Sequence, residues 1–206
     1  QIVKDELRHA AVMYGLLADL GVDVDAHVRR HDEALTMRIA ADADIGTRRI
    51  TADSRVNIFY YPIDTWADFV FFNFCMDRGA GHQLEDVRAS SYGPWARAIE
   101  GIFKEEKFHI RHGEVWVKRL AQDPATRDEA QRTFEKWYVR TMNIFGRPGS
   151  PKNALYRRLR LKLRDNGEVR QAFADEVAGL CRAHGLAVPA WTPVWDELPE
   201  DAHIPG

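Results

Sequence analysis

Apolar residues recur along this chain at three- and four-residue intervals, which is the spacing of one face of an α-helix. Almost no segment alternates apolar and polar residues with the period of two that is typical of a half-buried strand. Glycines, prolines and capping residues interrupt the helical pattern at intervals of about 20 to 30 residues. The pattern therefore predicts an all-α protein.

The predicted helices begin and end at these signals. A capping box formed by Thr65 and Asp68 marks the start of one helix, and prolines mark the starts of others. The helices run from the start of the chain to Leu20, Val28 to Ala43, Thr65 to Arg88, Pro94 to Gln122, Asp123 to Gly146 and Pro151 to Arg164, and a last one follows the Asn166-Gly167 turn and ends at Gly185.

The end of the chain has a different composition. Four of the nine prolines fall between Ala187 and Gly206, and proline does not continue a helix. We therefore expect one helical bundle over residues 1–186 and an irregular tail over residues 187–206.

Composition limits the class of protein. Of the 206 residues, 45% are hydrophobic, which excludes a disordered chain. The 29 Lys and Arg against 31 Asp and Glu give a net charge of -2, so neither nucleic acid nor a membrane surface is expected as the main partner. The longest apolar stretch, Phe69 to Met76, is interrupted by Asn73 and is far shorter than the roughly 20 residues that span a bilayer.

The two cysteines, Cys75 and Cys181, lie far apart and form no Cys-x-x-Cys spacing. This pattern supports neither a disulfide framework nor a zinc finger. A reducing, cytoplasmic setting fits best.

Candidate chemistry lies in a Glu-x-x-His pattern that occurs at three places. The pairs are Glu6 with His9, Glu106 with His109, and Glu200 with His203. The third pair lies in the proline-rich tail, and we assign it no role. The first two lie inside predicted helices, where a spacing of three places both side chains on one face.

Both helical pairs share the apolar stripe of their helix, and Asp77 lies on the apolar stripe of a third helix. The stripe residues are Ile2, Met13, Leu16, Leu17 and Leu20 for the first pair, Ile99, Ile102, Phe103, Ile110, Val117 and Leu120 for the second, and Trp66, Val70, Phe74, Ala80 and Leu84 for Asp77. All five ionisable groups should therefore point inward.

Five buried ionisable groups need partners, because an unpaired carboxylate in an apolar core costs several kcal/mol. One metal site would use all five. A Glu and a His three apart can bind one cation together, while carboxylates from other helices bridge to a second cation. Carboxylates with one imidazole per metal suit iron or manganese, and the thiolates that favour zinc or an iron–sulfur cluster are absent, so iron is the better candidate.

The alternative is a set of buried salt bridges, in which Arg8, Lys107 or Arg111 turns inward, or ordinary core histidines. For one pair alone this alternative would be favoured, but three helices together favour the metal site. A dinuclear carboxylate site takes a Glu from each of two helices and a Glu-x-x-His from each of the other two. Asp77 supplies one single carboxylate, and we expect the other upstream of Gln1, because the helical pattern is already running at Ile2.

Several segments resemble a known family. They are Lys4 to His9 (KDELRH), Ile58 to Pro62 (IFYYP) with Thr65 to Asp68 (TWAD), Ser91 to Ala98 (SYGPWARA) with Lys104 to His109 (KEEKFH), and Met142 to Gly146 on to Gly185 to Pro189. The chain resembles the catalytic A subunit of the bacterial phenylacetyl-CoA epoxidase, a family of ferritin-like di-iron oxygenases. The resemblance covers nearly the whole chain, and the run from Ser91 to His109 is its most specific part.

The resemblance implies a ferritin-like four-helix bundle with additional C-terminal helices. By position it implies Glu6, His9, Asp77, Glu106 and His109 as ligands of two irons, with Asp77 where many relatives have Glu. It further implies O2 and an aryl-CoA substrate whose ring receives a 1,2-epoxide. Electrons from NAD(P)H would come through a separate reductase, because no Gly-x-Gly-x-x-Gly is present. A related non-catalytic subunit is expected as partner, in a homo- or hetero-oligomer.

Two other functions stay open. A non-catalytic scaffold subunit of such a complex would have lost its ligands, and an iron-oxidising ferritin-like protein would not need the Ser91 to Ala98 connection. The stretch from Val28 to Arg55 is longer than in the family and the tail after Pro189 diverges, and both could shape the substrate pocket.

Three weaker candidates complete the set. The basic residues between Arg157 and Arg164 would suit a CoA phosphate, although a solvated face or a subunit contact is the more frequent role. His112 is interpreted as a surface histidine and His82 as a residue without a metal role.

Overall fold

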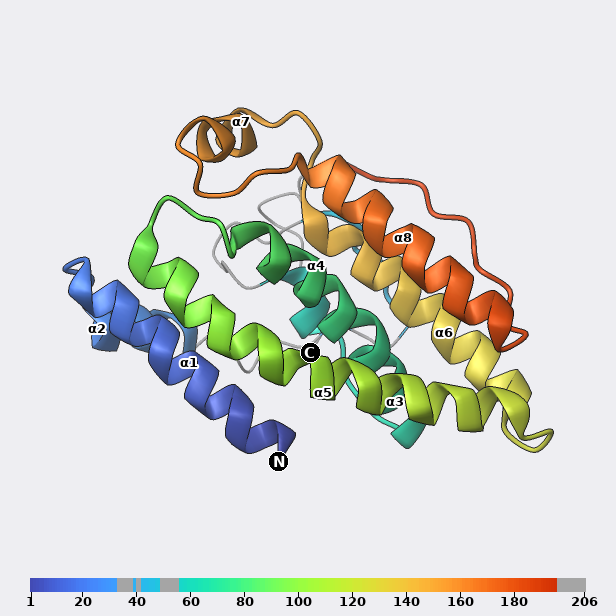
Figure 1. The fold of residues 1–206 in the computed structure, drawn as a ribbon. Helices are drawn as coiled ribbons and strands as arrows, with labels where there is room; N and C mark the ends of the chain where they lie inside the picture. Colours follow the sequence, from blue (N-terminus) through green and yellow to red (C-terminus); the bar gives the residue numbers. More distant parts are fainter. Residues whose placement is uncertain (33–38, 40–41, 49–55, 196–206) are drawn as a thin grey trace. The chain divides into compact units, whose positions relative to one another are not determined.

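A computed structural model describes residues 1–32, 39, 42–48 and 56–195. Within these ranges every regular element is a helix, which confirms the all-α prediction there. Figure 1 follows the helices from the blue N-terminus to the red C-terminal helix. By its contacts the chain divides into two units, one of Gln1–Pro62 with Val194–Gly206 and one of Ile63–Pro193.

The first unit contains α1 (Ile2–Asp19), α2 (Val24–Asp32) and the short 3-10 helix η2 (Asn57–Tyr60). α1 ends as predicted, because Gly21 takes a left-handed φ of +80° just beyond it. η2 is tied to an earlier loop, since the Asn57 amide donates to the Gly46 carbonyl at 2.6 Å.

The bounds predicted for the second helix, Val28 to Ala43, are wrong. The helix begins earlier, at Val24, because the Asp23 carboxylate accepts a hydrogen bond from Ala26 N at 2.9 Å and caps the first turn. Ala43 is not helical, because the Asp44 side chain accepts from Gly46 N at 2.8 Å and fixes a turn there. Residues 33–38 and 40–41 of that prediction lie outside the described residues.

The second unit is built from long helices that pack side by side. α3 (Trp66–Phe72), the π turn η3 (Asn73–Asp77) and α4 (Arg78–Val87) form one continuous run, which packs against the other long helices. These are α5 (Gly93–Gln122), α6 (Arg127–Met142) and α8 (Asn166–Ala183), with the 3-10 turn η4 (Asn143–Phe145) and α7 (Pro151–Arg158) between α6 and α8. The packing is consistent with the ferritin-like bundle expected from the sequence.

The capping box at the start of α3 is confirmed. Asp68 N donates to Thr65 Oγ1 at 3.0 Å, and Thr65 N donates to Asp68 Oδ2 at 3.2 Å. The other oxygen of Asp68 accepts from Trp137 Nε1 at 2.9 Å and pairs with Lys136, both on α6. Burial alone would raise the pKa of Asp68, but these hydrogen bonds hold the pKa below its usual value. Asp68 therefore joins the start of α3 to α6.

Aromatic side chains fill the core of the second unit. Phe71, Phe74, Phe134, Trp137 and Phe173 are each 0% exposed, and the Phe71 and Phe134 ring centroids lie 6.1 Å apart. Each fully buried Phe contributes about 1.5–3 kcal/mol of hydrophobic stabilisation. The α3–η3–α4 run therefore rests on a close-packed layer that resists local distortion.

Three further helix ends differ from prediction. α6 ends at Met142 rather than Gly146, because the chain continues as the 3-10 turn η4. α6 begins at Arg127 rather than Asp123, because the Asp123 carboxylate accepts from Ala125 N at 2.9 Å and forms a turn. α7 ends at Arg158 rather than Arg164, because Arg160 takes a left-handed φ of 56°. The predicted irregular tail holds for residues 187–195, and residues 196–206 lie outside the described part.

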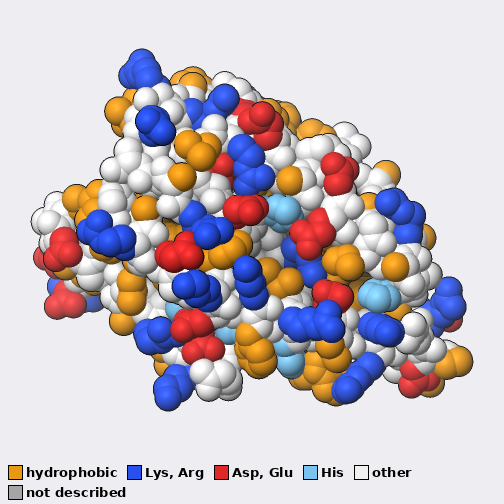
Figure 2. Space-filling model, viewed as in Figure 1, with side chains coloured by type: hydrophobic (Ala, Val, Ile, Leu, Met, Phe, Trp, Pro, Cys, Tyr) orange, Lys and Arg blue, Asp and Glu red, His pale blue; other side chains and the backbone are white. Residues whose placement is uncertain are grey.

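The surface carries both signs of charge. Figure 2 shows basic and acidic side chains interspersed over the face in view, in keeping with the net charge of -2. Of the helices that the structure describes, none combines the length and apolarity needed to cross a membrane.

Candidate metal centre

The Glu106–His109 pair lies near the middle of α5. The spacing of three places both side chains on one helix face, and His109 Nδ1 lies 3.5 Å from Glu106 Oε2. The side chains of Glu106 and His109 are 7% and 0% exposed, and Ile102 and Val117 on the same stripe are also buried. The pair faces the interior, as predicted.

Asp77 ends the π turn η3 and is half-buried. Asp77, Glu106 and His109 each offer one ligand atom, and these three atoms all lie within 4.8 Å of one another. Of the residues predicted to share the buried face of Asp77, Phe74 is fully buried, but Trp66 is 51% exposed. Trp66 is the first residue of α3, where its ring packs edge-on against Trp116 at a centroid distance of 5.2 Å.

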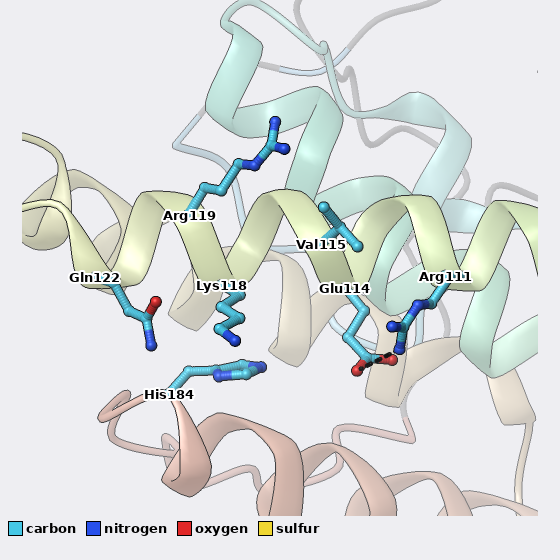
Figure 3. Close-up of a pocket in the computed structure, with 7 residues that line it drawn as sticks. All are labelled: Arg111, Glu114, Val115, Lys118, Arg119, Gln122 and His184. Carbon is cyan, nitrogen blue, oxygen red and sulfur yellow. Dashed lines mark hydrogen bonds and ion pairs between the residues drawn. The ribbon is translucent and has the colours of Figure 1, made fainter.

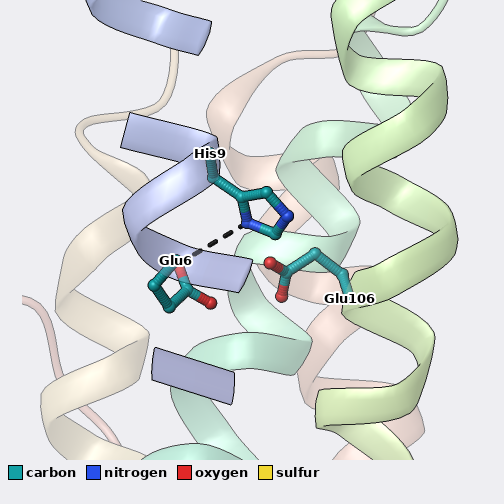
Figure 4. Close-up of side chains that lie close together, drawn as sticks. All are labelled: Glu6, His9 and Glu106. Carbon is teal, nitrogen blue, oxygen red and sulfur yellow. Dashed lines mark ion pairs between the residues drawn. The ribbon is translucent and has the colours of Figure 1, made fainter. Parts of the chain in front are cut away.

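The Glu6–His9 pair on α1 has the same spacing and a similar geometry. His9 Nδ1 lies 3.7 Å from Glu6 Oε2, as the dashed line in Figure 4 shows, and the same figure draws Glu106 on α5. His9 is buried as predicted, but the side chain of Glu6 is 52% exposed. Glu6 adjoins the outer face of α1, where Leu7 is 69% exposed, and Leu20 at the helix end is 62% exposed, also contrary to prediction.

The donor set of Asp77, Glu106 and His109 fits a divalent metal. Two carboxylates and an imidazole suit iron or manganese, and such groups in an interior require a compensating charge. The cations that the salt-bridge alternative would need have other contacts. Arg8 pairs with Asp5 at 3.6 Å, Lys107 Nζ lies over the Phe103 ring at 5.2 Å, and Arg111 pairs with Glu114 at 3.5 Å.

Among the described residues, neither thiol belongs to a group of side chains that could hold a metal. Burial raises the pKa of Cys75 well above its usual value and that of Cys181 to about 12. Both thiols are therefore protonated at neutral pH. The available ligands in this region are oxygen and nitrogen atoms.

A buried arginine, Arg78, directly follows the π turn and connects it to two other helices. Arg78 is 2% exposed, and it donates to Glu176 Oε1 on α8 at 2.8 Å, to Glu114 Oε2 on α5 at 3.4 Å and to the Phe74 carbonyl at 3.1 Å. Hydrogen bonds from His82 and then from Arg78 lower the pKa of Glu176 to about 2. This network was not predicted from the sequence. A charged residue directly after Asp77 in a buried helix was the available signal.

A separate pocket of about 430 Å³ lies between α5 and the end of α8, and Figure 3 shows the residues that line it. They are Arg111, Glu114, Val115, Lys118, Arg119, Gln122 and His184. Arg119 lies in the last turn of α5 and His184 at the C-terminal cap of α8, where positive side chains interact favourably with the helix dipole. Their clustering therefore has a structural explanation, and we assign this pocket no role in the centre.

The three weaker candidates from the sequence, His112, His82 and the basic segment, each contact a particular side chain. His112 is half-buried rather than a plain surface residue, because its Nδ1 lies 3.4 Å from Asn73 Oδ1. His82 Nε2 lies 2.7 Å from Glu176. In the basic segment after α7, Arg164 and Lys162 lie 3.0 and 4.0 Å from Asp86. The contact of this segment with a CoA phosphate stays a prediction.

Comparison with known proteins shows the family. Residues 1–203 match the family described as phenylacetic acid catabolic protein. The chain belongs to this family. It is 28% identical over 191 residues to the A subunit of the 1,2-phenylacetyl-CoA epoxidase of Escherichia coli (strain K12), with 91% of this chain and 56% of that protein aligned. It is 32% identical over 123 residues to the benzoyl-CoA oxygenase component B of Aromatoleum evansii, with 59% of this chain and 24% of that protein aligned.

These comparisons confirm the resemblance seen in the sequence. The aligned region spans about half the length of the first relative and about a quarter of the second. One relative is a subunit of an epoxidase and the other is a component of an oxygenase. The name of each includes the name of an aryl-CoA thioester. The relatives are therefore parts of multicomponent oxygenases.

Proposed function

We propose that this chain is the catalytic di-iron subunit of a multicomponent oxygenase that acts on an aryl-CoA thioester. One atom of O2 would enter the ring of a phenylacetyl-CoA-like substrate as a 1,2-epoxide. The observation that carries the proposal is the Asp77–Glu106–His109 cluster, whose ligand atoms lie within 4.8 Å of one another. A chain that only served as a scaffold would not need to retain such a cluster.

In this proposal Glu6 and His9 bind the second iron of the same centre. They repeat the Glu-x-x-His spacing of α5, with His Nδ1 to Glu Oε2 distances of 3.7 and 3.5 Å in the two pairs. The family match extends over residues 1–203 and so includes both helices. It also supports the single bundle over residues 1–186, with an irregular tail over 187–206, that we propose for the whole chain.

Iron bound at this site would supply the reduction of O2, with electrons from NAD(P)H delivered by a separate reductase. The chain's own residues hold the metals and keep water away. Glu106 and His109 are almost completely buried, so their interaction with a cation is stronger than it would be in water. The carboxylates of Asp77 and Glu106 favour oxidised iron, because their negative charge stabilises the higher metal charge.

The proposal implies several partners. They are an aryl-CoA substrate, O2, the reductase and a related non-catalytic subunit, in a homo- or hetero-oligomer. We propose the cytoplasm as the location, because the Cys75 and Cys181 thiols are unpaired and suit a reducing compartment.

The test is iron content followed by turnover. The purified chain, produced with iron, should contain about two irons, and with the non-catalytic subunit, a reductase and NAD(P)H it should consume phenylacetyl-CoA and O2 together. A chain that binds no iron would contradict the proposal and favour a scaffold. A chain that binds and oxidises iron but never consumes the thioester would instead be a ferritin-like iron oxidase.

A further inference from the structure

The π turn η3 widens the α3–α4 helical run over Asn73–Asp77. π turns are rare within α-helices and recur at functional sites, since the extra residue redirects the side chains around it. This turn begins at a buried polar residue, Asn73, and ends at the candidate ligand Asp77. The contacts of Asn73 are therefore central to what the turn does.

Both ends of the Asn73 amide have a partner. Asn73 is 3% exposed, and its Nδ2 donates to Asp77 Oδ2. Its Oδ1 lies 3.4 Å from His112 Nδ1 on α5. The orientation of the amide follows from chemistry, because a carboxylate only accepts hydrogen bonds and so must face the NH2 group. Asn73 thus links the Asp77 carboxylate to α5.

Gly113 lets α5 approach this amide. A Cβ on Gly113 would lie 2.9 Å from Asn73 Oδ1 and 2.9 Å from both Cα and N of Phe74, closer than real Cβ atoms come to backbone. Gly113 is four residues after His109 and therefore lies on the same face of α5. The close contact at Gly113 holds the π turn against the helix face that carries Glu106 and His109.

We propose that Asn73 is a positioning residue for the Asp77 carboxylate and that Gly113 provides the space for it. Asn73 fixes one carboxylate oxygen, so that Asp77 stays directed toward Glu106 and His109 before a metal binds. Partners of this kind orient metal ligands and tune their affinity. This inference rests on the proposed function, since it concerns how the chain holds the metal.

The first test replaces Asn73 and measures anaerobic Fe(II) binding to the purified chain. Asn73→Ala should weaken Fe(II) binding by about 10- to 100-fold and shift the ligand-field bands of the bound metal. The matched control is Asn153→Ala. Asn153 is also 3% exposed and donates to Asn166 Oδ1 at 3.1 Å, so its loss should lower the thermal midpoint without changing the Fe(II) affinity.

A second pair of variants leaves Asn73 in place. Gly113→Ala should weaken Fe(II) binding, because its Cβ displaces Asn73 and the Phe74 backbone. Gly101→Ala is the control on the same helix. A Cβ there meets nothing within 4 Å, so Fe(II) binding should be unchanged and the helix slightly more stable.

The outcomes separate the two proposals. Weaker Fe(II) binding in Asn73→Ala and Gly113→Ala, but not in the two controls, supports the positioning role. Binding by Asn73→Ala equal to that of the parent overturns the positioning role and leaves the proposed function intact. A parent chain that binds no Fe(II) overturns both.

Discussion

The α1 and α5 helices carry the same Glu-x-x-His spacing, but the two pairs differ in how deeply their side chains are buried. The His Nδ1 to Glu Oε2 distances are similar, at 3.7 Å on α1 and 3.5 Å on α5. The glutamate side chains differ sharply, since Glu6 is 52% exposed and Glu106 is 7% exposed. The spacing alone fixes which side chains share a helix face, but it does not fix how deeply they are buried.

The flanking residues explain the difference. Around Glu106 the stripe residues Ile99 and Val117 are 1% and 0% exposed. On α1, by contrast, no apolar residue of the predicted stripe is buried, and Val3 and Leu7 beside Glu6 are 74% and 69% exposed. A carboxylate in the α5 setting is desolvated and needs a cation, whereas one in the α1 setting remains solvated without one. We therefore expect the two pairs to respond differently to substitution.

The largest effect should come from Glu106→Gln, which keeps the shape of the side chain and removes the charge. Fe(II) affinity should fall by at least about 100-fold. This loss exceeds the range typical of residues that contact a metal ligand but do not bind the metal themselves. In the metal-free chain the same change should alter stability by no more than about 1 kcal/mol, because the amide keeps the shape of the side chain. Iron titration and thermal unfolding of the metal-free variant check the two parts. A larger fall in metal-free stability would indicate that Glu106 serves in a salt bridge.

Glu6→Gln should have the next largest effect and tests whether α1 takes part in the centre. We expect iron content to fall from about two to about one per chain, with little change in metal-free stability because the Glu6 side chain is half exposed. Elemental analysis measures the stoichiometry. Loss of both irons would show that the two pairs depend on each other for metal binding. Retention of both irons would exclude Glu6 as a ligand.

Matched apolar substitutions test directly the difference in burial between the apolar residues of α1 and α5. Ile99→Ala on α5 should destabilise the chain by about 2–5 kcal/mol, because it leaves a cavity. Leu7→Ala on α1 should change stability by no more than about 0.5 kcal/mol. Chemical denaturation of both variants, without metal, gives the comparison. A large loss of stability in Leu7→Ala would mean that Leu7 is buried in solution.

The smallest effect is a dependence of stability on pH. The pKa of Glu176 is lowered from its usual 4.5 to about 2 by His82 and then Arg78, so its contribution is complete above pH 4.5 and is lost as the pH falls toward 2. Because the Glu176 side chain is 44% exposed, we expect about 1 kcal/mol after allowing for solvent screening. Denaturation of the parent and of Glu176→Gln across this range should show the pH dependence in the parent and less of it in the variant.

Local signals allowed much of the fold to be predicted. The capping box at Thr65 and the proline near the start of α5 lie next to the elements that they begin, so the sequence predicts both starts. The start of α2 and the end of α7 were missed because they depend on particular side-chain or backbone details, namely the Asp23 cap and the left-handed Arg160.

The candidate site was predictable only in part. Apolar stripes place Glu106 and His109 inward, and the structure agrees. The π turn at Asp77 has no sequence signal of its own, because one extra residue barely alters the apolar spacing over so short a segment. The Arg78–Glu176 pair joins residues 98 positions apart, so no local pattern could reveal it. Asn73 was visible only as the polar interruption of the longest apolar stretch.

The most direct test of the di-iron centre is to locate iron by anomalous scattering in crystals of the iron-loaded chain. We expect two iron peaks, one held by Glu106, His109 and Asp77 and one held by Glu6 and His9. Iron found only at surface histidines, or no iron at the Asp77–Glu106–His109 cluster, would contradict the central claim that this chain holds a di-iron centre.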